Sequence, residues 1–151
     1  MTYIIIIILG VILDRITKIH AINNFIDNPY NGTILNFTYL ENRGAAFGIL
    51  QDNRAFFIIL TIVIIGYLIY YFIKHYKTNT TLLNIAITFI ITGALGNFYD
   101  RLVKTYVVDF IEFAFVNFPV FNVADIFVTV GSILIIIYLL FFEEGEKKNE
   151  R

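Results

Sequence analysis

The stretch from residue 55 to residue 73, AFFIILTIVIIGYLIYYFI, constrains the fold of this chain more than any other feature. It carries no charged residue and is long enough to cross a bilayer as one helix. The whole chain fits a membrane setting, because 58% of its 151 residues are hydrophobic and 17% are aromatic. A soluble domain of this size is much less apolar. The sequence therefore predicts an α-helical integral membrane protein.

Three other segments are candidates for further spans. Residues 82–99 and 124–142 are apolar except for polar groups gathered at one end of each. Residues 3–21 begin with YIIIIILGVIL and then admit charged side chains, which fits either a signal-like anchor or a fourth span. We interpret this segment as a retained span, since it has no A-x-A cleavage site and no basic region before the apolar run. We therefore predict four transmembrane helices in a single membrane domain.

Four spans place both termini on one side of the membrane and residues 22–54 and 100–121 together on the other. Basic residues are divided evenly between the two sides, so counting them does not decide the orientation. The connection from Lys74 to Thr81 is short and has basic but no acidic residues, which is typical of cytoplasmic turns. We therefore place the termini, including the polar tail of residues 143–151, in the cytoplasm.

Two segments outside the spans have the composition of β-strands. The stretch NPYNGTILNFTYLENRGAAFGIL, residues 28–50, is rich in β-branched and aromatic residues, opens with Asn-Pro and Asn-Gly turn signals, and alternates roughly between polar and apolar residues through ILNFTYL. The stretch YVVDFIEFAF, residues 106–115, is rich in β-branched and aromatic residues. We expect the first segment to form a small β-structure on the outer membrane surface, with which the second could pair.

Composition also excludes several kinds of site. The chain has no cysteine, so it has no disulfide framework, no thiolate nucleophile and no thiolate metal site. Its formal net charge of -1 argues against a nucleic-acid partner.

Some of the charged residues within or beside the spans have a structural interpretation. Asp14 and Lys18 are four residues apart and share a helix face, so they fit an ion pair that closes the first span. Asn97 and Arg101 are one turn apart, with Asp100 beside them. Arg101 either forms a fork pair with a carboxylate or contacts a ligand, since ionisable groups in membrane helices are candidates for function.

Two carboxylates are candidates for catalysis. Asp125 follows Asn122 by three residues, so these two residues also fit a capping box at the start of the fourth span. Asp109 lies in VVDFIEF with no helix to cap and no basic neighbour within four residues, and burying such a carboxylate costs several kcal/mol unless it is protonated or paired. Two such acids near the outer ends of helices predict a pair sharing one proton, in which one is a general base for water and the other an acid.

Five motifs in order along the chain resemble those of the bacterial lipoprotein signal peptidases (signal peptidase II), a family of intramembrane aspartic proteases. They are DRITK (14–18), ENRGAAFGIL (41–50), GALGNFYDR (93–101), VVDF (107–110) and FNVAD (121–125). Each is weak alone, but together they cover nearly the whole chain. One departure is Thr92, which stands where the family often has a glycine, so helix packing is expected to differ there.

The resemblance implies a fold, an activity and a set of site residues. The fold is four helices with an extracytoplasmic β-cradle, and the orientation has the termini in the cytoplasm. The activity is removal of the signal peptide from diacylglyceryl-modified prolipoproteins, before the lipidated cysteine, in the bacterial cytoplasmic membrane. No cofactor or metal is implied, and we expect a monomer in contact with membrane lipid. The implied residues are the catalytic pair Asp109 and Asp125, the substrate-binding residues Asn42, Gly44, Asn97, Arg101 and Asn122, and the supporting residues Asp14, Lys18 and Asp100.

Two other classes of function are considered. In a proton-coupled or ion-conducting protein, the acids at positions 14, 100, 109 and 125 would form a relay across the bilayer. All four fall in the outer half of the predicted topology, and the cytoplasmic half offers little besides Asn84, so the path would be broken. A purely structural subunit would lose no chemistry when either Asp109 or Asp125 is neutralised.

Overall fold

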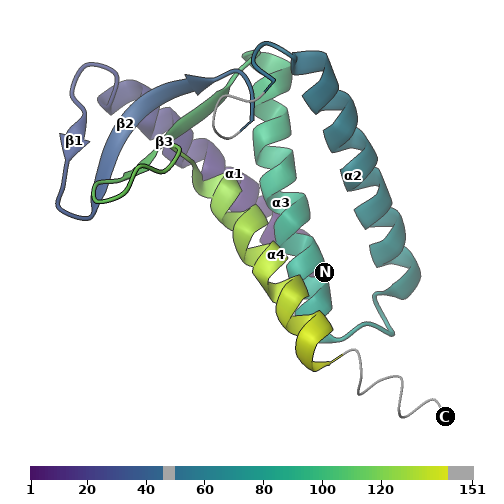
Figure 1. The fold of residues 1–151 in the computed structure, drawn as a ribbon. Helices are drawn as coiled ribbons and strands as arrows, with labels where there is room; N and C mark the ends of the chain where they lie inside the picture. The colour runs from purple at the N-terminus through teal and green to yellow at the C-terminus, as the bar shows by residue number, and fades with distance from the viewer. Residues whose placement is uncertain (46–49, 143–151) are drawn as a thin grey trace.

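The fold, seen in a computed structural model, is a group of four long helices with a small sheet at one end (Figure 1). The structure describes residues 1–45 and 50–142, so the predicted tail of residues 143–151 and part of the ENRGAAFGIL motif lie outside the described residues. In chain order the elements are α1 (Thr2–Asn24), β1 (Tyr30–Asn31), β2 (Leu35–Asn42), α2 (Arg54–His75), α3 (Thr81–Val103), β3 (Val107–Phe113) and α4 (Val123–Phe141).

Within the described residues, α2, α3 and α4 are long and apolar enough to cross a membrane. The 23-residue helix α1 is as long as α3, but its three charged side chains keep it outside that group. The fourth crossing therefore stays a prediction. The arrangement of α1 is nevertheless inside out for a soluble helix, because Lys18 is fully buried while Ile4 and Leu9 are about 60% exposed.

Helix α3 lies at the centre and packs against the other three helices. Close approach of the helices depends on small residues, since a Cβ on Gly96 would lie 2.7 Å from the Oδ2 atom of Asp14. The departure at Thr92 is accommodated by Gly10 of α1, because a Cβ on Gly10 would collide with the Thr92 methyl group. The Thr92 hydroxyl donates a hydrogen bond to the carbonyl oxygen of Thr88 at 2.7 Å, so this buried polar group is satisfied within its own helix.

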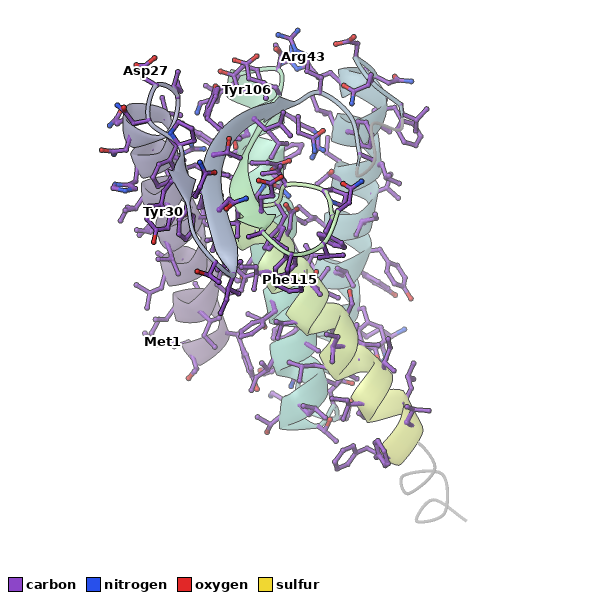
Figure 2. The ribbon with its side chains drawn as sticks, turned by 60° about the vertical axis from the view of Figure 1, so that its left-hand side comes forward. Met1, Asp27, Tyr30, Arg43, Tyr106 and Phe115 are labelled. Carbon is purple, nitrogen blue, oxygen red and sulfur yellow. The ribbon has the colours of Figure 1, made fainter. Side chains whose placement is uncertain are left out.

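The sheet is antiparallel with strand order β1-β2-β3, which confirms that the two strand-like segments pair. In the register, Leu40 lies opposite Asp109 and Asn42 lies opposite Val107, with an irregularity between Phe37 and Leu40. Val108 and Phe110 of β3 pack in a core with Ala21 of α1. The sheet is thereby attached to the end of α1 farthest from Met1, as Figure 2 shows by the positions of Met1 and Asp27.

The end of α3 lies beside the start of β3. Helix α3 continues past Tyr99, where the predicted span ended, to Val103, so Asp100 and Arg101 lie on its last turn. Thr105 then adopts a left-handed conformation with φ 74°, and β3 starts two residues later. The backbone N–H of Val108 donates to Asp100 Oδ2 at 3.3 Å, which ties the strand to the end of the helix.

Candidate active site

The two predicted carboxylates line a single cavity of about 550 Å³. Asp109 comes from β3 and Asp125 from the first turn of α4, so the strand and the helix that meet beside the end of α3 each supply one. The same cavity is lined by four other predicted residues, Asn42, Gly44, Asn97 and Arg101.

Asp109 is 1% exposed and accepts two hydrogen bonds from amide groups. The side-chain nitrogen of Asn122 lies 2.6 Å from Asp109 Oδ1, and that of Asn42 lies 2.8 Å from Oδ2. Burial, and then the nearby charge of Asp125, raise the pKa of Asp109 to about 7, although the two amide hydrogen bonds act in the opposite direction. This carboxyl group is therefore suited to carry a proton near neutral pH.

Asp125 has two different partners for its two oxygens. Its Oδ1 atom accepts a hydrogen bond from the side-chain nitrogen of Asn97 at 2.7 Å. Its Oδ2 atom accepts one from the backbone N–H of Asn122 at 3.1 Å, while the Asn122 side chain caps the backbone of Asp125 at 3.0 Å. The capping box is therefore present, and it does not compete with a catalytic role because only one carboxylate oxygen is used for it.

Three asparagines, Asn42, Asn97 and Asn122, contact the carboxylates. The side-chain oxygen of each accepts a hydrogen bond from a group that can only donate, and this fixes the orientation of the amide. Lys18 Nζ donates to the oxygen of Asn97 at 2.9 Å, and the Gly44 backbone N–H donates to the oxygen of Asn42 at 3.0 Å. The oxygen of Asn122 accepts the capping N–H of Asp125. Because an ammonium group and a backbone N–H cannot accept, each amide must turn its NH₂ group toward a carboxylate. The fold thus directs hydrogen-bond donors at both acids.

Arg101 does not form the fork pair that was one of its two interpretations. Among the described residues it has no ion pair within 4.0 Å, and it donates instead to the Gly44 carbonyl oxygen at 3.1 Å. Its guanidinium lies over the ring of Phe57, 4.7 Å from the centroid, and interacts electrostatically with Asp109 and Asp125. The arginine is therefore held at the wall of the cavity by a carbonyl group and an aromatic ring.

A buried charge cluster lies behind the asparagines. Lys18 pairs with Asp14 at 3.0 Å, as its spacing predicted, and also with Asp100 at 3.1 Å. Asp14 in turn accepts the backbone N–H of Ala124 at the start of α4, at 3.0 Å. The cluster joins α1, α3 and α4 and reaches the carboxylate pair through Asn97.

Sequence reasoning missed three basic residues around this cluster. Arg15 forms the close pair with Asp100, at 2.6 Å, and Lys104 lies 3.9 Å from the same carboxylate. Arg54, at the start of α2, donates to the carbonyl oxygens of residues 101 and 102 at 2.7 and 2.8 Å. The four-residue spacing from Asp100 to Lys104 was a usable signal, whereas the Arg15 and Arg54 contacts join residues far apart in sequence.

No group of three or more His, Cys, Asp and Glu side chains in the described part of the chain is placed to hold a metal ion.

A comparison with protein families gives a match over most of the chain. The family model described as Signal peptidase (SPase) II matches residues 6–141. The chain belongs to the signal peptidase II family. A lipoprotein signal peptidase of Clostridium novyi (strain NT) is 47% identical over 143 residues, covering 91% of this chain and 96% of the relative. One of Caldicellulosiruptor bescii is 44% identical over 149 residues, covering 97% and 95%.

Solved structures agree with the family at the level of the fold. A structure described as a bacterial membrane enzyme, at 2.3 Å resolution, superposes with a TM-score of 0.86 at 41% identity and covers 99% of this chain and 92% of its own. A second, at 1.9 Å, has a TM-score of 0.83 at 42% identity, covering 93% and 94%. The helices and sheet of this signal peptidase II family member are therefore those of a known membrane enzyme.

Proposed function

We propose that this member of the signal peptidase II family is an aspartic endopeptidase in which Asp109 and Asp125 are the catalytic pair. Its substrates are diacylglyceryl-modified prolipoproteins, and it hydrolyses the bond before the lipidated cysteine. The single observation that carries the proposal is that the two carboxylates, from separate elements, line one cavity and both accept a hydrogen bond from Asn122. Cleavage of such a substrate by the purified chain tests it.

The proposed reaction begins with Asp109 protonated and Asp125 ionised. The raised pKa of Asp109 supports the first state, and the position of Asp125 in the first turn of α4 supports the second, because the helix dipole favours an anion there. Asp125 removes a proton from water, the water oxygen bonds to the scissile carbonyl carbon, and Asp109 protonates the carbonyl oxygen. The product of this step is a tetrahedral diol.

The diol then collapses with the proton positions reversed. Asp109 takes back a proton from one hydroxyl, the carbonyl group re-forms, and the carbon–nitrogen bond breaks. Asp125 donates its proton to the departing cysteine nitrogen. Both carboxyl groups have then returned to their starting states, so the cycle needs only water and substrate.

The remaining predicted residues divide into three roles in this proposal. Asn42, Asn97 and Asn122 orient the carboxylates, because their amide groups are already engaged with them. Gly44 and Arg101 contact the substrate from the cavity wall. Asp14, Lys18 and Asp100 support Asn97 and the start of α4 from behind.

The lining of the cavity fits a lipid-modified substrate. Besides the polar residues it consists largely of aliphatic side chains of α4, such as Ile126, Val128 and Val130, and of aromatic side chains before α4. Acyl chains and an apolar signal helix are stabilised against such a surface by about 25 cal/mol for each Å² removed from water. The reacting carbonyl group would lie at the polar end, near the carboxylates.

A relay of protons across the bilayer has less support. The four acids lie together near the sheet end of the helices, since Asp14 and Asp100 share Lys18 while Asp109 and Asp125 share Asn122. Asn84, near the opposite end of α3, is bound to the Tyr76 carbonyl oxygen and to Asn79. This asparagine therefore serves the α2–α3 connection.

The proposed topology has four crossings, cytoplasmic termini and the carboxylate pair at the outer face. Support for a spanning α1 comes from its exposed aliphatic surface and buried charges. A reporter inserted at Thr78 is expected to read as cytoplasmic and one inserted near Asn31 as external. The opposite readings would put the carboxylates on the wrong side for exported lipoproteins and would overturn this topology.

The pH dependence of cleavage tests the proposed proton assignment. Asp109 has a raised pKa of about 7, so its proton is present below that pH and is lost above it. Cleavage is therefore expected to fall as the pH rises through about 7, approaching a tenfold loss per pH unit well above it. Stability should also fall across the window from about 4 to about 7, because the folded state holds this proton more tightly than the unfolded chain. A kcat/KM profile that stays flat from pH 6 to 9 would contradict Asp109 as the acid.

A further inference from the structure

A second cavity, of about 430 Å³, lies beside the one that holds the carboxylates. The two cavities share the side chains of Asn42 and Ala45 and the segment of residues 118–120 before α4. Asn42 donates directly to Asp109, so the second cavity begins at a residue that touches the catalytic pair. The two cavities are therefore adjacent and have part of their lining in common.

The chemistry of the second cavity differs from that of the first. Its lining includes the carboxylates Glu41 and Glu112 and the amides Gln51 and Asn117, and none of its described lining residues is basic. Glu112 Oε2 accepts one hydrogen bond, from Asn36 at 3.0 Å. The polar lining has a net negative charge and is rich in hydrogen-bond acceptors.

One basic side chain lies close to this lining. Arg43 pairs with Glu41 at 3.2 Å and lies 4.0 Å from Asp52, with about half of its side chain exposed. It reduces the negative charge at the rim without entering the lining of the cavity. Glu112 has no basic partner among the described residues, so the acidic character of the cavity depends mainly on it.

We infer that the second cavity binds the polypeptide segment that follows the cleaved bond, and that it favours basic over acidic side chains there. The inference rests on the proposed function. The signal helix and the acyl chains need the apolar cavity, whereas a polar segment placed there would lose its hydration without compensation. The segment must leave the carboxylates toward water, and the second cavity is the polar space that adjoins them at Asn42. Glu41 precedes Asn42 on β2, and Glu112 follows Asp109 by three residues on β3. An extended chain advances about 3.3–3.6 Å per residue, so the second to fourth residues after the cysteine are the ones expected beside these two glutamates.

The test uses two diacylglyceryl-modified prolipoprotein peptides that differ only at the second to fourth residues after the cysteine, which are Lys in one and Glu in the other. The measured quantity is the ratio of kcat/KM for the Lys peptide to kcat/KM for the Glu peptide, taken for the same protein sample. This ratio does not depend on how much of a variant is folded. The wild type is expected to favour the Lys peptide by roughly fivefold or more at low salt, and the preference should shrink as salt is added.

The variants are Glu112→Gln, Glu41→Gln and both together, with Asp27→Asn as the control that removes one negative charge elsewhere. Asp27 is exposed at the far end of α1 (Figure 2), outside the second cavity. Glu112→Gln should lower the ratio by about two- to fivefold, as for single solvent-accessible charge pairs, and the double variant should bring it close to one. Asp27→Asn should retain the wild-type ratio.

The outcomes separate the inference from the proposed function. Cleavage of both peptides with a wild-type ratio near one, or a double variant that keeps the wild-type ratio, would overturn the binding of the segment here while leaving the peptidase assignment intact. Failure to cleave either peptide would remove the proposed function, and the inference with it.

Discussion

Asp109→Asn and Asp125→Asn are each expected to lower the rate of cleavage by about 10³-fold or more while the protein still inserts and folds. Asparagine is nearly isosteric with aspartate but cannot exchange a proton with water, so each change removes one half of the proposed acid–base pair. The double variant should be little worse than either single one, because residues that act as one catalytic unit are strongly non-additive. Initial rates with a lipid-modified substrate measure the effect.

These variants also separate catalysis by Asp125 from helix capping. A role limited to the capping box predicts a loss on the order of 1 kcal/mol of stability with cleavage retained. Asp109→Asn carries its own small structural cost, since both oxygens of Asp109 face amide donors and the new NH₂ group would meet one of them. Asp27→Asn, an exposed site away from the carboxylates, is the matched control and should cleave at the wild-type rate.

Lys18→Met is expected to destabilise the protein by about 3–5 kcal/mol, the usual cost of removing one partner from a buried ion pair. Lys18 is fully buried and holds Asp14, Asp100 and the oxygen of Asn97, so its loss leaves two buried carboxylates without their shared cation. Cleavage should fall as well, because Asn97 loses the donor that orients it toward Asp125. Unfolding of the detergent-solubilised protein measures the stability.

The control for Lys18 is Lys74→Met, at an exposed position in the last turn of α2, which should change the stability by no more than about 0.5 kcal/mol. The pairing itself is tested by a cycle with Asp14→Ala and Lys18→Ala. If the double change is destabilised as much as the sum of the two single changes, the coupling between these residues is absent.

The parts of the fold that follow local patterns could be predicted from the sequence. The apolar runs predicted the helices α2, α3 and α4, and the strand-like composition of two segments indicated the pairing of β2 with β3. The ion pair of Asp14 with Lys18 followed from helical spacing alone. Helix α3 extends to Val103, beyond the predicted span of residues 82–99, and Asp100 is buried against Lys18 and Arg15 in its last turn.

The parts that depend on which distant residues meet could not be predicted in this way. Arg15 and Asp100 are 85 positions apart, so nothing local indicated that Arg15 rather than Arg101 would hold that carboxylate. Asn122 has two roles, as the cap of α4 and as a hydrogen-bond donor to Asp109. The second role could not be predicted without knowing that β3 lies beside the start of α4. A capping box and a catalytic pair looked like alternatives in sequence, but they use different atoms in the structure.

The most direct test of the central claim is the mass of the products formed from a diacylglyceryl-modified prolipoprotein by the purified protein in detergent. The account predicts two products from the wild type, a signal peptide ending before the cysteine and a mature chain beginning with the lipidated cysteine, and intact substrate after the same incubation with Asp109→Asn. Equal amounts of both products from the wild type and from Asp109→Asn would show that the carboxylate pair is not the catalyst.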